Sequence, residues 1–547
     1  MVTSQEAISS CGEITESWLQ GHINLAAVAV TLLGFVARLW TASGTFLNPD
    51  EALHFRLANQ PSLALTYQES LTAAHPPLLP LVLHFWRSPG NSELWLRLPL
   101  VLASVAFCWM FYQWLTSAAG YLAGFVGLLF VALLPPIVSF SAEIRQYPLL
   151  LAFLASALYL LDASFAKKSA GRMAAFSLCL YLALLSHYSA FLFAAALGIY
   201  ALLRILTERP PAGLVAAWAI GQLGTLAIAT FLYKSHLSKL GESRSALQGW
   251  KSEVYLSHSY FDPAHGNPLM FLVGHTFGVF QYIFGQLAVG DAMGLLFVVA
   301  VALLLRGKGF PGDRSSWRRL GIFLLLPLAI GGCAGLARVY PYGGTRHAAY
   351  LIIPGVAGVS VAVARLAGGR WGRGLAIVVF VLAACIAFGK GRPPRMDRAD
   401  QRRAHMAAAL EFVQQQVAPS NLIFTDYQTN LILGHYLCQQ RLISFDVAPA
   451  NFEQFSCGGH RIVSTDYKLW RFWAENFTQV WPRFVQAYSL KPGDTVWIVQ
   501  SGWGIALPED LHQHRAEFRD LQFQLFGDNI KIFKAEVGEL VPAVARR

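Results

Sequence analysis

Two adjacent carboxylates directly follow the first apolar run of the sequence. Residues 48–52 read Asn-Pro-Asp-Glu-Ala, and charged groups at a membrane surface are costly unless they are solvated or functional. Asp50 or Glu51 could act as a general base that takes a proton from a hydroxyl group. The segment is equally suited to begin a helix, since Pro49 fits the first turn and both acids favour its positive end. The sequence leaves both interpretations open.

Two further segments combine rigid backbone with groups that could contact a polar ligand. Residues 74–79 read Ala-His-Pro-Pro-Leu-Leu, where the prolines fix the backbone beside His75, a donor or acceptor near neutral pH. Residues 141–147 read Ser-Ala-Glu-Ile-Arg-Gln-Tyr, and an arginine such as Arg145 is well suited to hold phosphate. An interfacial histidine and a solvated Glu143–Arg145 loop pair are the simpler interpretations.

A fourth segment, residues 340–347, is rich in aromatic residues and glycine. It reads Tyr-Pro-Tyr-Gly-Gly-Thr-Arg-His, so it ends in two basic residues, Arg346 and His347. It is either a tight loop between helices with interfacial aromatics or a loop that binds phosphate or sugar. Lys234 and His236 follow another apolar run and could add positive charge.

The composition is that of a membrane protein. Of the 547 residues, 55% are hydrophobic and only 13% are charged, whereas soluble domains carry about 25% charged residues. Uncharged runs of roughly 20 residues recur, and each could cross a bilayer. They predict about eleven transmembrane helices, near residues 24–44, 95–116, 119–139, 147–166, 172–187, 189–207, 213–233, 289–306, 317–338, 347–366 and 371–389.

Basic residues favour one orientation of these helices. Alternating spans place the segments 45–94, 140–146, 234–288 and 339–346 on one side, provided that residues 268–288 do not cross. The opposite side receives most of the arginine and lysine of the short loops, so the four segments are predicted to face the periplasm or exterior of a plasma (inner) membrane. The formal net charge of +11 therefore indicates contact with membrane lipids rather than with nucleic acid. The basic residues between 390 and 403 oppose this orientation.

The last part of the chain, 390–547, is predicted to be a small soluble α/β domain on the same outer side. Segments 421–425 and 495–499 alternate like strands, and 402–417 resembles an amphipathic helix. Cys438 and Cys457 could pair if this domain faces an oxidising compartment. The preceding residues, 1–389, form the predicted membrane region, with 45–94 as its first outer loop. The acidic start of the chain is atypical of a signal peptide, so the first apolar run is expected to remain as an anchor.

The order of the polar motifs resembles a known family. Asp50-Glu51-Ala52-x-His54, His75-Pro76-Pro77-Leu78, the run Glu-Leu-Trp-Leu-Arg-Leu-Pro at 93–99 and Glu143-x-Arg145-x-Tyr147 look like glycosyltransferase family 39. These are dolichyl-phosphate-mannose mannosyltransferase-like proteins of GT-C fold, similar to lipid A aminoarabinose transferases. The loop at 342–347 also looks like bacterial members.

The resemblance implies a reaction and roles for the residues. Asp50 would deprotonate an acceptor hydroxyl, which displaces polyprenyl phosphate from the sugar with inversion, and Glu51 would orient the acceptor or join a metal site. Arg145 and Arg346 would hold the donor phosphate. Other candidate binding residues are His75, Glu143, Tyr147, His347 and Lys234. The resemblance leaves a divalent cation open as a cofactor, and the acceptor open as protein, lipid or glycan.

Three other functions compete with sugar transfer. A transporter or flippase of lipid-linked sugars would need a polar path through the membrane midplane, and the predicted spans carry few charges there. An enzyme of the O-antigen ligase type would also use outward arginines, but gives no reason for the Asp50–Glu51 pair. A scaffold that binds partners through its last domain is the third alternative.

Overall fold

The computed structural model describes residues 4–239, 256–307, 313–367, 401–438, 443, 446–467, 469–503, 507 and 518–539. The chain divides into two compact units. The first comprises Met1–Thr41, Leu71–Leu79 and Arg97–Met396, and the second comprises Ala42–Ser70, Pro80–Leu96 and Asp397–Arg547. Most of the predicted first outer loop therefore groups with the C-terminal domain rather than with the membrane region.

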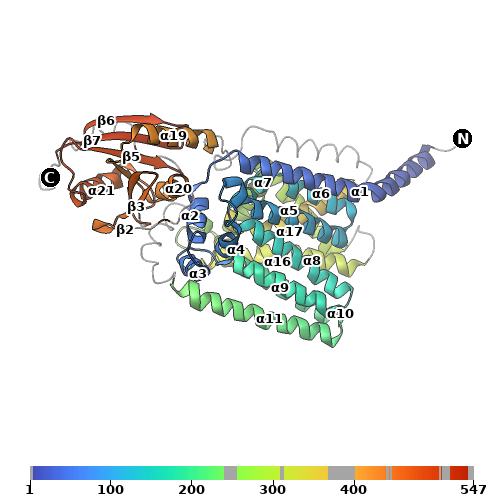
Figure 1. The fold of residues 1–547 in the computed structure, drawn as a ribbon. Helices are drawn as coiled ribbons and strands as arrows, with labels where there is room; N and C mark the ends of the chain where they lie inside the picture. The colour runs from blue at the N-terminus through green and yellow to red at the C-terminus, as the bar shows by residue number, and fades with distance from the viewer. Residues whose placement is uncertain are drawn as a thin grey trace. The chain divides into compact units, whose positions relative to one another are not determined.

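The first unit is a helical bundle in which apolar helices run alongside one another (Figure 1). Within the described residues, eight helices are long and apolar enough to cross a membrane, and a ninth candidate is a bent pair. The chain is thus an integral membrane protein, as its composition predicts. The predicted span 371–389 lies outside the described residues. The helices of this unit are α1 (Ser4–Ser43), α5 (Glu93–Ala119), α6 (Tyr121–Leu133), α7 (Pro135–Ser141), α8 (Tyr147–Ala166), α9 (Ala170–Ser186), α10 (Ala190–Glu208), α11 (Ala212–Leu232), α14 (Pro268–Phe284), α15 (Leu287–Arg306), α16 (Arg314–Leu336) and α17 (Ile352–Ala367).

The predicted span 119–139 is a broken helix rather than a straight one. Helices α6 and α7 meet at an angle of 57°, because Pro135 and Pro136 lack the N–H groups that a continuous helix needs. The carbonyl groups four residues earlier are satisfied by the fully buried Arg38 of α1. It donates from Nη2 to Val131 O at 2.8 Å and from Nη1 to Ala132 O at 2.7 Å. This arginine therefore caps a proline break inside the bundle.

Helix α14 approaches both the end of α16 and the break between α6 and α7. Near its start, Phe271 approaches Gly335 at the end of α16. The residue after α14, Gly285, approaches Pro136 at the break between α6 and α7. Both contacts lie toward the end of the bundle that carries the connections 142–146 and 337–345. With 17 residues, α14 is shorter than the candidate membrane spans of the described residues.

The second unit combines short helices with a mixed sheet. The helices are α2 (Pro49–Ala58), α3 (Leu63–Ser70), α4 (Leu78–Trp86), α19 (Arg403–Gln416), α20 (Tyr427–Leu437) and α21 (Ala474–Ala487). The strands are β1 (Leu422–Thr425), β2 (Asp446–Val447), β3 (Glu453–Cys457), β4 (His460–Ser464), β5 (Thr495–Ser501), β6 (Phe518–Leu525) and β7 (Ile530–Val537). Their order is β2-β3-β4-β1-β5-β7-β6. The central strand β1 pairs in parallel with β4 and β5, and the other pairs are antiparallel.

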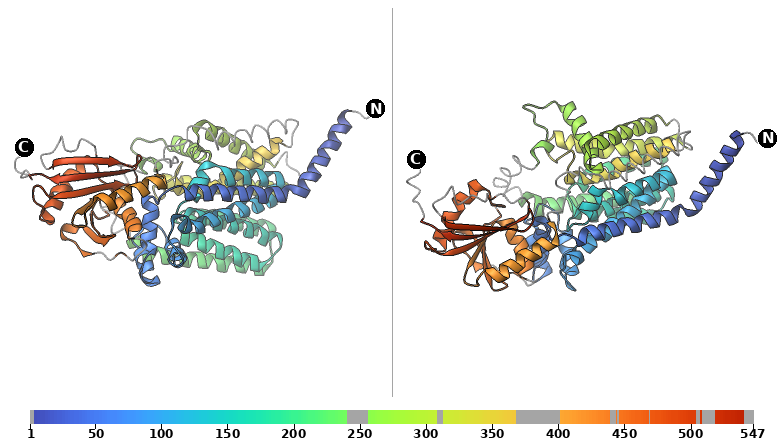
Figure 2. Two further views of the ribbon diagram at one scale, coloured as in Figure 1. Left: turned by 45° about the horizontal axis from the view of Figure 1, so that its top comes forward. Right: turned by 90° about the horizontal axis from the view of Figure 1, so that it is seen from above.

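Alternate residues of the sheet face two separate apolar layers. On β1, Ile423 packs in the cluster that contains α19 and α20, whereas Phe424 packs in the cluster that contains α21. The period of two along a strand produces this division, and Figure 2 shows helices on both faces of the sheet. The sequence predictions of strands at 421–425 and 495–499 and of a helix at 402–417 are confirmed, as is the pairing of Cys438 with Cys457.

Candidate functional site

The connection between α7 and α8 carries Glu143 and Arg145 at one end of the bundle. The Arg145 side chain is only 4% exposed, and its Nε lies 3.7 Å from Oε2 of Glu143. Tyr147 begins α8 directly after this connection and is buried. A guanidinium group held in so dry a place is an effective anion-binding group. Glu143 holds the arginine in place and offsets part of its charge.

The loop before α17 brings Arg346 and His347 to the same end of the bundle. Gly343 has a positive φ of 126°, and a side chain on it would lie 2.8 Å from the His275 ring. Glycine is needed there because the loop passes directly over α14. The hydroxyl of Tyr340 donates to the carbonyl of His347 at 3.2 Å. The residues Tyr-Gly-Gly therefore shape a tight turn that delivers the two basic side chains.

His187, in the short connection between α9 and α10, lies within the electrostatic influence of both Arg145 and Arg346. Burial, together with the positive charges of Arg145 and Arg346, lowers the pKa of His187 to about 3. The ring stacks on His75 at a centroid distance of 5.4 Å and on His347 at 6.2 Å, and it contacts Tyr147 at 5.1 Å. Segments far apart in the sequence thus converge on one histidine. His187 was not among the residues predicted from the sequence, where its one signal is the polar triplet His-Tyr-Ser between two apolar runs.

Lys234 does not join this cluster, whereas His236 lies close to it. Lys234 is exposed, while His236 is buried in a short π-helix, Tyr233–Leu237. Its Nε2 donates to the carbonyl of Ala73 at 2.7 Å, and its Nδ1 is hydrogen-bonded to the hydroxyl of Tyr188. The extra residue of a π turn changes which side chains face inward. His236 therefore ties the segment that carries His75 to the connection that carries His187.

Asp50 and Glu51 lie in the second unit, at the start of α2. Asn48 accepts from the N–H of Glu51 at 3.0 Å, and Oε2 of Glu51 accepts from the N–H of Asn48 at 3.0 Å. This reciprocal pair is a capping box, so the helix-start interpretation is correct for Glu51, which is fully buried. Asp50 is half-buried beside it, and its position is fixed by a well-capped helix.

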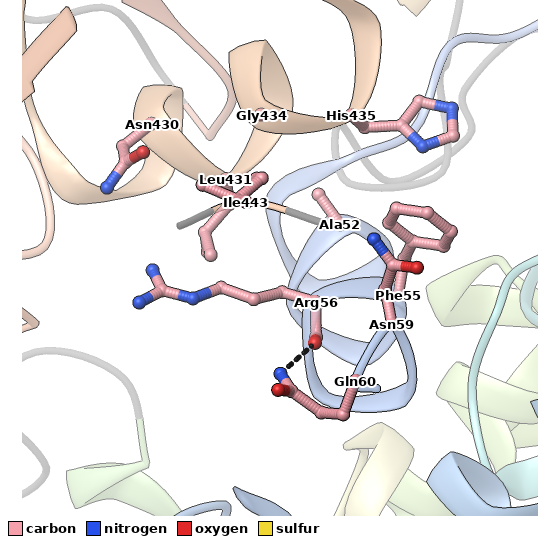
Figure 3. A pocket seen from close by; sticks show the side chains of 10 residues that line it. All are labelled: Ala52, Phe55, Arg56, Asn59, Gln60, Asn430, Leu431, Gly434, His435 and Ile443. Carbon is pink, nitrogen blue, oxygen red and sulfur yellow. Dashed lines mark hydrogen bonds between the residues drawn. The ribbon is translucent and has the colours of Figure 1, made fainter. Parts of the chain in front are cut away.

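A small pocket lies between α2 and α20 within the second unit (Figure 3). Phe55, Arg56 and Asn59 reach it from α2, and Asn430 and His435 from α20. Arg56 is paired with Glu453 at 3.0 Å. At about 100° per residue, this stripe lies roughly on the opposite side of α2 from Asp50. The pocket and the candidate base therefore use different faces of the helix.

In the described part of the chain, no three His, Cys, Asp or Glu side chains are arranged to hold a metal ion. Glu51, the residue for which the resemblance implies a metal role, is engaged in the capping box.

Comparison with solved structures identifies proteins that have a similar fold. ArnT from Cupriavidus metallidurans bound to undecaprenyl phosphate is 14% identical, with 93% of this chain and 97% of that chain covered and a TM-score of 0.53. The apo form of the same protein is 13% identical, with 95% and 98% covered and a TM-score of 0.52. No family model matches the chain, and no curated protein matches it by sequence. The chain is thus similar to ArnT over nearly its whole length and has the GT-C fold that the motif resemblance predicts.

Proposed function

We propose that this protein is a membrane glycosyltransferase that moves a sugar from a polyprenyl-phosphate donor to an acceptor hydroxyl, with inversion of the anomeric centre. The observation that carries the proposal is the convergence of Arg145 and Arg346 on His187 at one end of an apolar bundle. A lipid-linked phosphate has its head group at the membrane interface, where such a pair of cations would receive it. The ArnT structure of the same fold has undecaprenyl phosphate bound, which supports this class of donor.

In the proposed reaction, Arg145 and Arg346 bind the leaving group and Asp50 acts as the base. The two guanidinium groups stabilise the negative charge that grows on the phosphate as the bond from its oxygen to the anomeric carbon breaks. Asp50 takes the proton of the acceptor hydroxyl, whose oxygen forms the new glycosidic bond. The products are the glycosylated acceptor and polyprenyl phosphate. A hexose or pentose donor and a protein, lipid or glycan acceptor all fit this chemistry.

The substitution Asp50→Asn tests the proposal. Loss of a general base slows a reaction by about 10²–10⁴-fold, whereas loss of the charge at a helix start costs only about 0.3–1 kcal/mol of stability. Purified full-length protein in nanodiscs is given undecaprenyl-phosphate-linked hexoses and pentoses together with a cell-envelope extract, and release of undecaprenyl phosphate is measured. Glu69→Gln, at an exposed carboxylate of α3, is the matched control and should retain the wild-type rate.

Two outcomes contradict the proposal in different ways. Wild-type rates in the Asp50→Asn protein would rule out Asp50 as the base. Movement of lipid-linked sugar across the bilayer without any sugar transfer, and without dependence on Asp50, would favour the transporter. A folded Asp50→Asn variant with the transfer rate abolished supports the enzyme.

A further inference from the structure

The protonation state of His187 follows from its hydrogen bonds. The N–H of Ser189 donates to Nδ1 at 3.2 Å, and the Ser189 hydroxyl lies 2.7 Å from the same nitrogen. A backbone N–H is only a donor, so Nδ1 must be the acceptor and carries no proton. A neutral imidazole with a bare Nδ1 bears its proton on Nε2. The turn therefore fixes one tautomer and disfavours the imidazolium, whose Nδ1–H would face another donor.

The surroundings of the ring leave this Nε2–H for a ligand. His187 is 1% exposed, and the hydrogen bonds that it makes with the described residues all involve Nδ1. The imidazoles of His75 and His347 stack on its ring. These ring contacts position the imidazole without using its Nε2–H. An anion held by the neighbouring arginines would supply an acceptor for this N–H.

We infer that the Nε2–H of His187 is a neutral hydrogen-bond donor to a phosphoryl oxygen of the polyprenyl-phosphate donor, which the nearby Arg145 and Arg346 also bind. The inference rests on the proposed function and adds a binding residue to it. Polyprenyl phosphate leaves as a monoester with a charge between one and two at neutral pH. The positive charges of the two guanidinium groups balance that negative charge, and the carboxylate of Glu143 reduces the positive charge beside Arg145.

A neutral third donor suits turnover better than a third cation. A hydrogen bond to an anion strengthens as charge accumulates on the phosphate during the transfer step. A third full charge would also tighten binding of the product, and uniform tightening of bound states does not raise the rate of the chemical step. The ring is also ill-suited to proton transfer, because a catalytic acid or base works best with a pKa near the operating pH.

A matched pair of substitutions separates the ligand role from a structural one. The amide nitrogen of His187→Gln can take the place of Nε2, whereas the amide of His187→Asn reaches only the place of Nδ1. Binding of undecaprenyl phosphate to the purified full-length protein in nanodiscs is the readout. A hydrogen bond to a charged group contributes about 1.5–3 kcal/mol, so Asn should weaken binding by roughly 10- to 160-fold, while Gln should stay within about threefold of wild type.

The outcomes are distinguishable from failure of the proposed function. No binding of undecaprenyl phosphate by the wild type defeats both claims. Binding by the wild type with Asn and Gln equally weak, or equally unaffected, overturns only the role of His187. Histidine-selective ¹⁵N NMR gives a second test that does not depend on the Asn variant folding. The His187 signal, identified by its loss in the Gln variant, should show a neutral ring protonated on Nε2 whose shift moves when undecaprenyl phosphate is added. A protonated ring, or an unmoved signal, contradicts the inference.

Discussion

At the scale of single residues, the candidate site combines two arginines with one buried histidine. Arg145 and Arg346 stand in short polar connections between long apolar runs, where a charged residue is costly and is therefore a candidate for function. His187 stands where one apolar helix ends and the next begins, and a lone histidine there is usually an interfacial residue. Its importance depends on the stack with His75 and His347, which comes from contacts across more than a hundred residues of sequence.

The depressed pKa of His187 predicts a loss of stability in acid. Its pKa is about 3 in the folded protein and 6.5 in an unperturbed chain. Between these values the unfolded chain binds a proton that the folded protein does not, so stability falls as the pH falls below 6.5. At pH 5 this residue alone costs about 2 kcal/mol. Thermal unfolding in detergent should therefore show the wild type losing stability relative to His187→Gln between pH 7.5 and 5. A constant difference in midpoint would contradict the buried, neutral ring.

At the scale of elements, the sequence predicted apolar helices well but not how one of them is broken. Pro135 and Pro136 lie within one apolar run, which reads as a single span because hydropathy does not register missing N–H groups. The partner of the freed carbonyl groups, Arg38, lies about a hundred residues earlier in α1. The bounds of the short helices α2, α3 and α4 were not predicted from the sequence, for a similar reason. Segment 45–94 is mixed in character, and its packing with the C-terminal domain is long-range.

The proline break gives a prediction for Arg38→Met. Methionine fills much of the same volume but leaves the carbonyl of Ala132 without the Arg38 donor and that of Val131 with only the weak Cys108 thiol donor at 3.5 Å. A buried unsatisfied group costs about 1–3 kcal/mol, so the variant should lose at least about 1–3 kcal/mol. Binding of undecaprenyl phosphate should weaken as well, since α7 positions Arg145. Arg38→Lys, which can serve one carbonyl, should fall in between. Thermal unfolding in detergent measures the order, and a Met variant as stable as wild type would refute the capping role.

At the scale of the whole molecule, two observations point to opposite sides of the membrane for the C-terminal domain. The basic residues between 390 and 403 favour the inside. The bond between Cys438 and Cys457 favours the outside, because disulfides persist in oxidising compartments. A long domain crosses the membrane largely regardless of its charge. The disulfide, by contrast, depends directly on the compartment, so it is the stronger of the two indications.

Single-cysteine labelling decides between these indications. In a background with the free cysteines replaced by alanine, Lys491→Cys places an exposed thiol before β5, and Lys168→Cys places one between α8 and α9. An outer-side domain requires a membrane-impermeant maleimide to label residue 491 in cells whose outer envelope is permeabilised, and residue 168 only after lysis. The reverse pattern would place the domain inside and exclude transfer on the outer face. Labelling of both sites in intact cells would show a leaky preparation, which a cytosolic marker protein detects. In the same cells, maleimide should label Cys438 and Cys457 only after a reducing agent is added, because an oxidising compartment keeps the two cysteines paired.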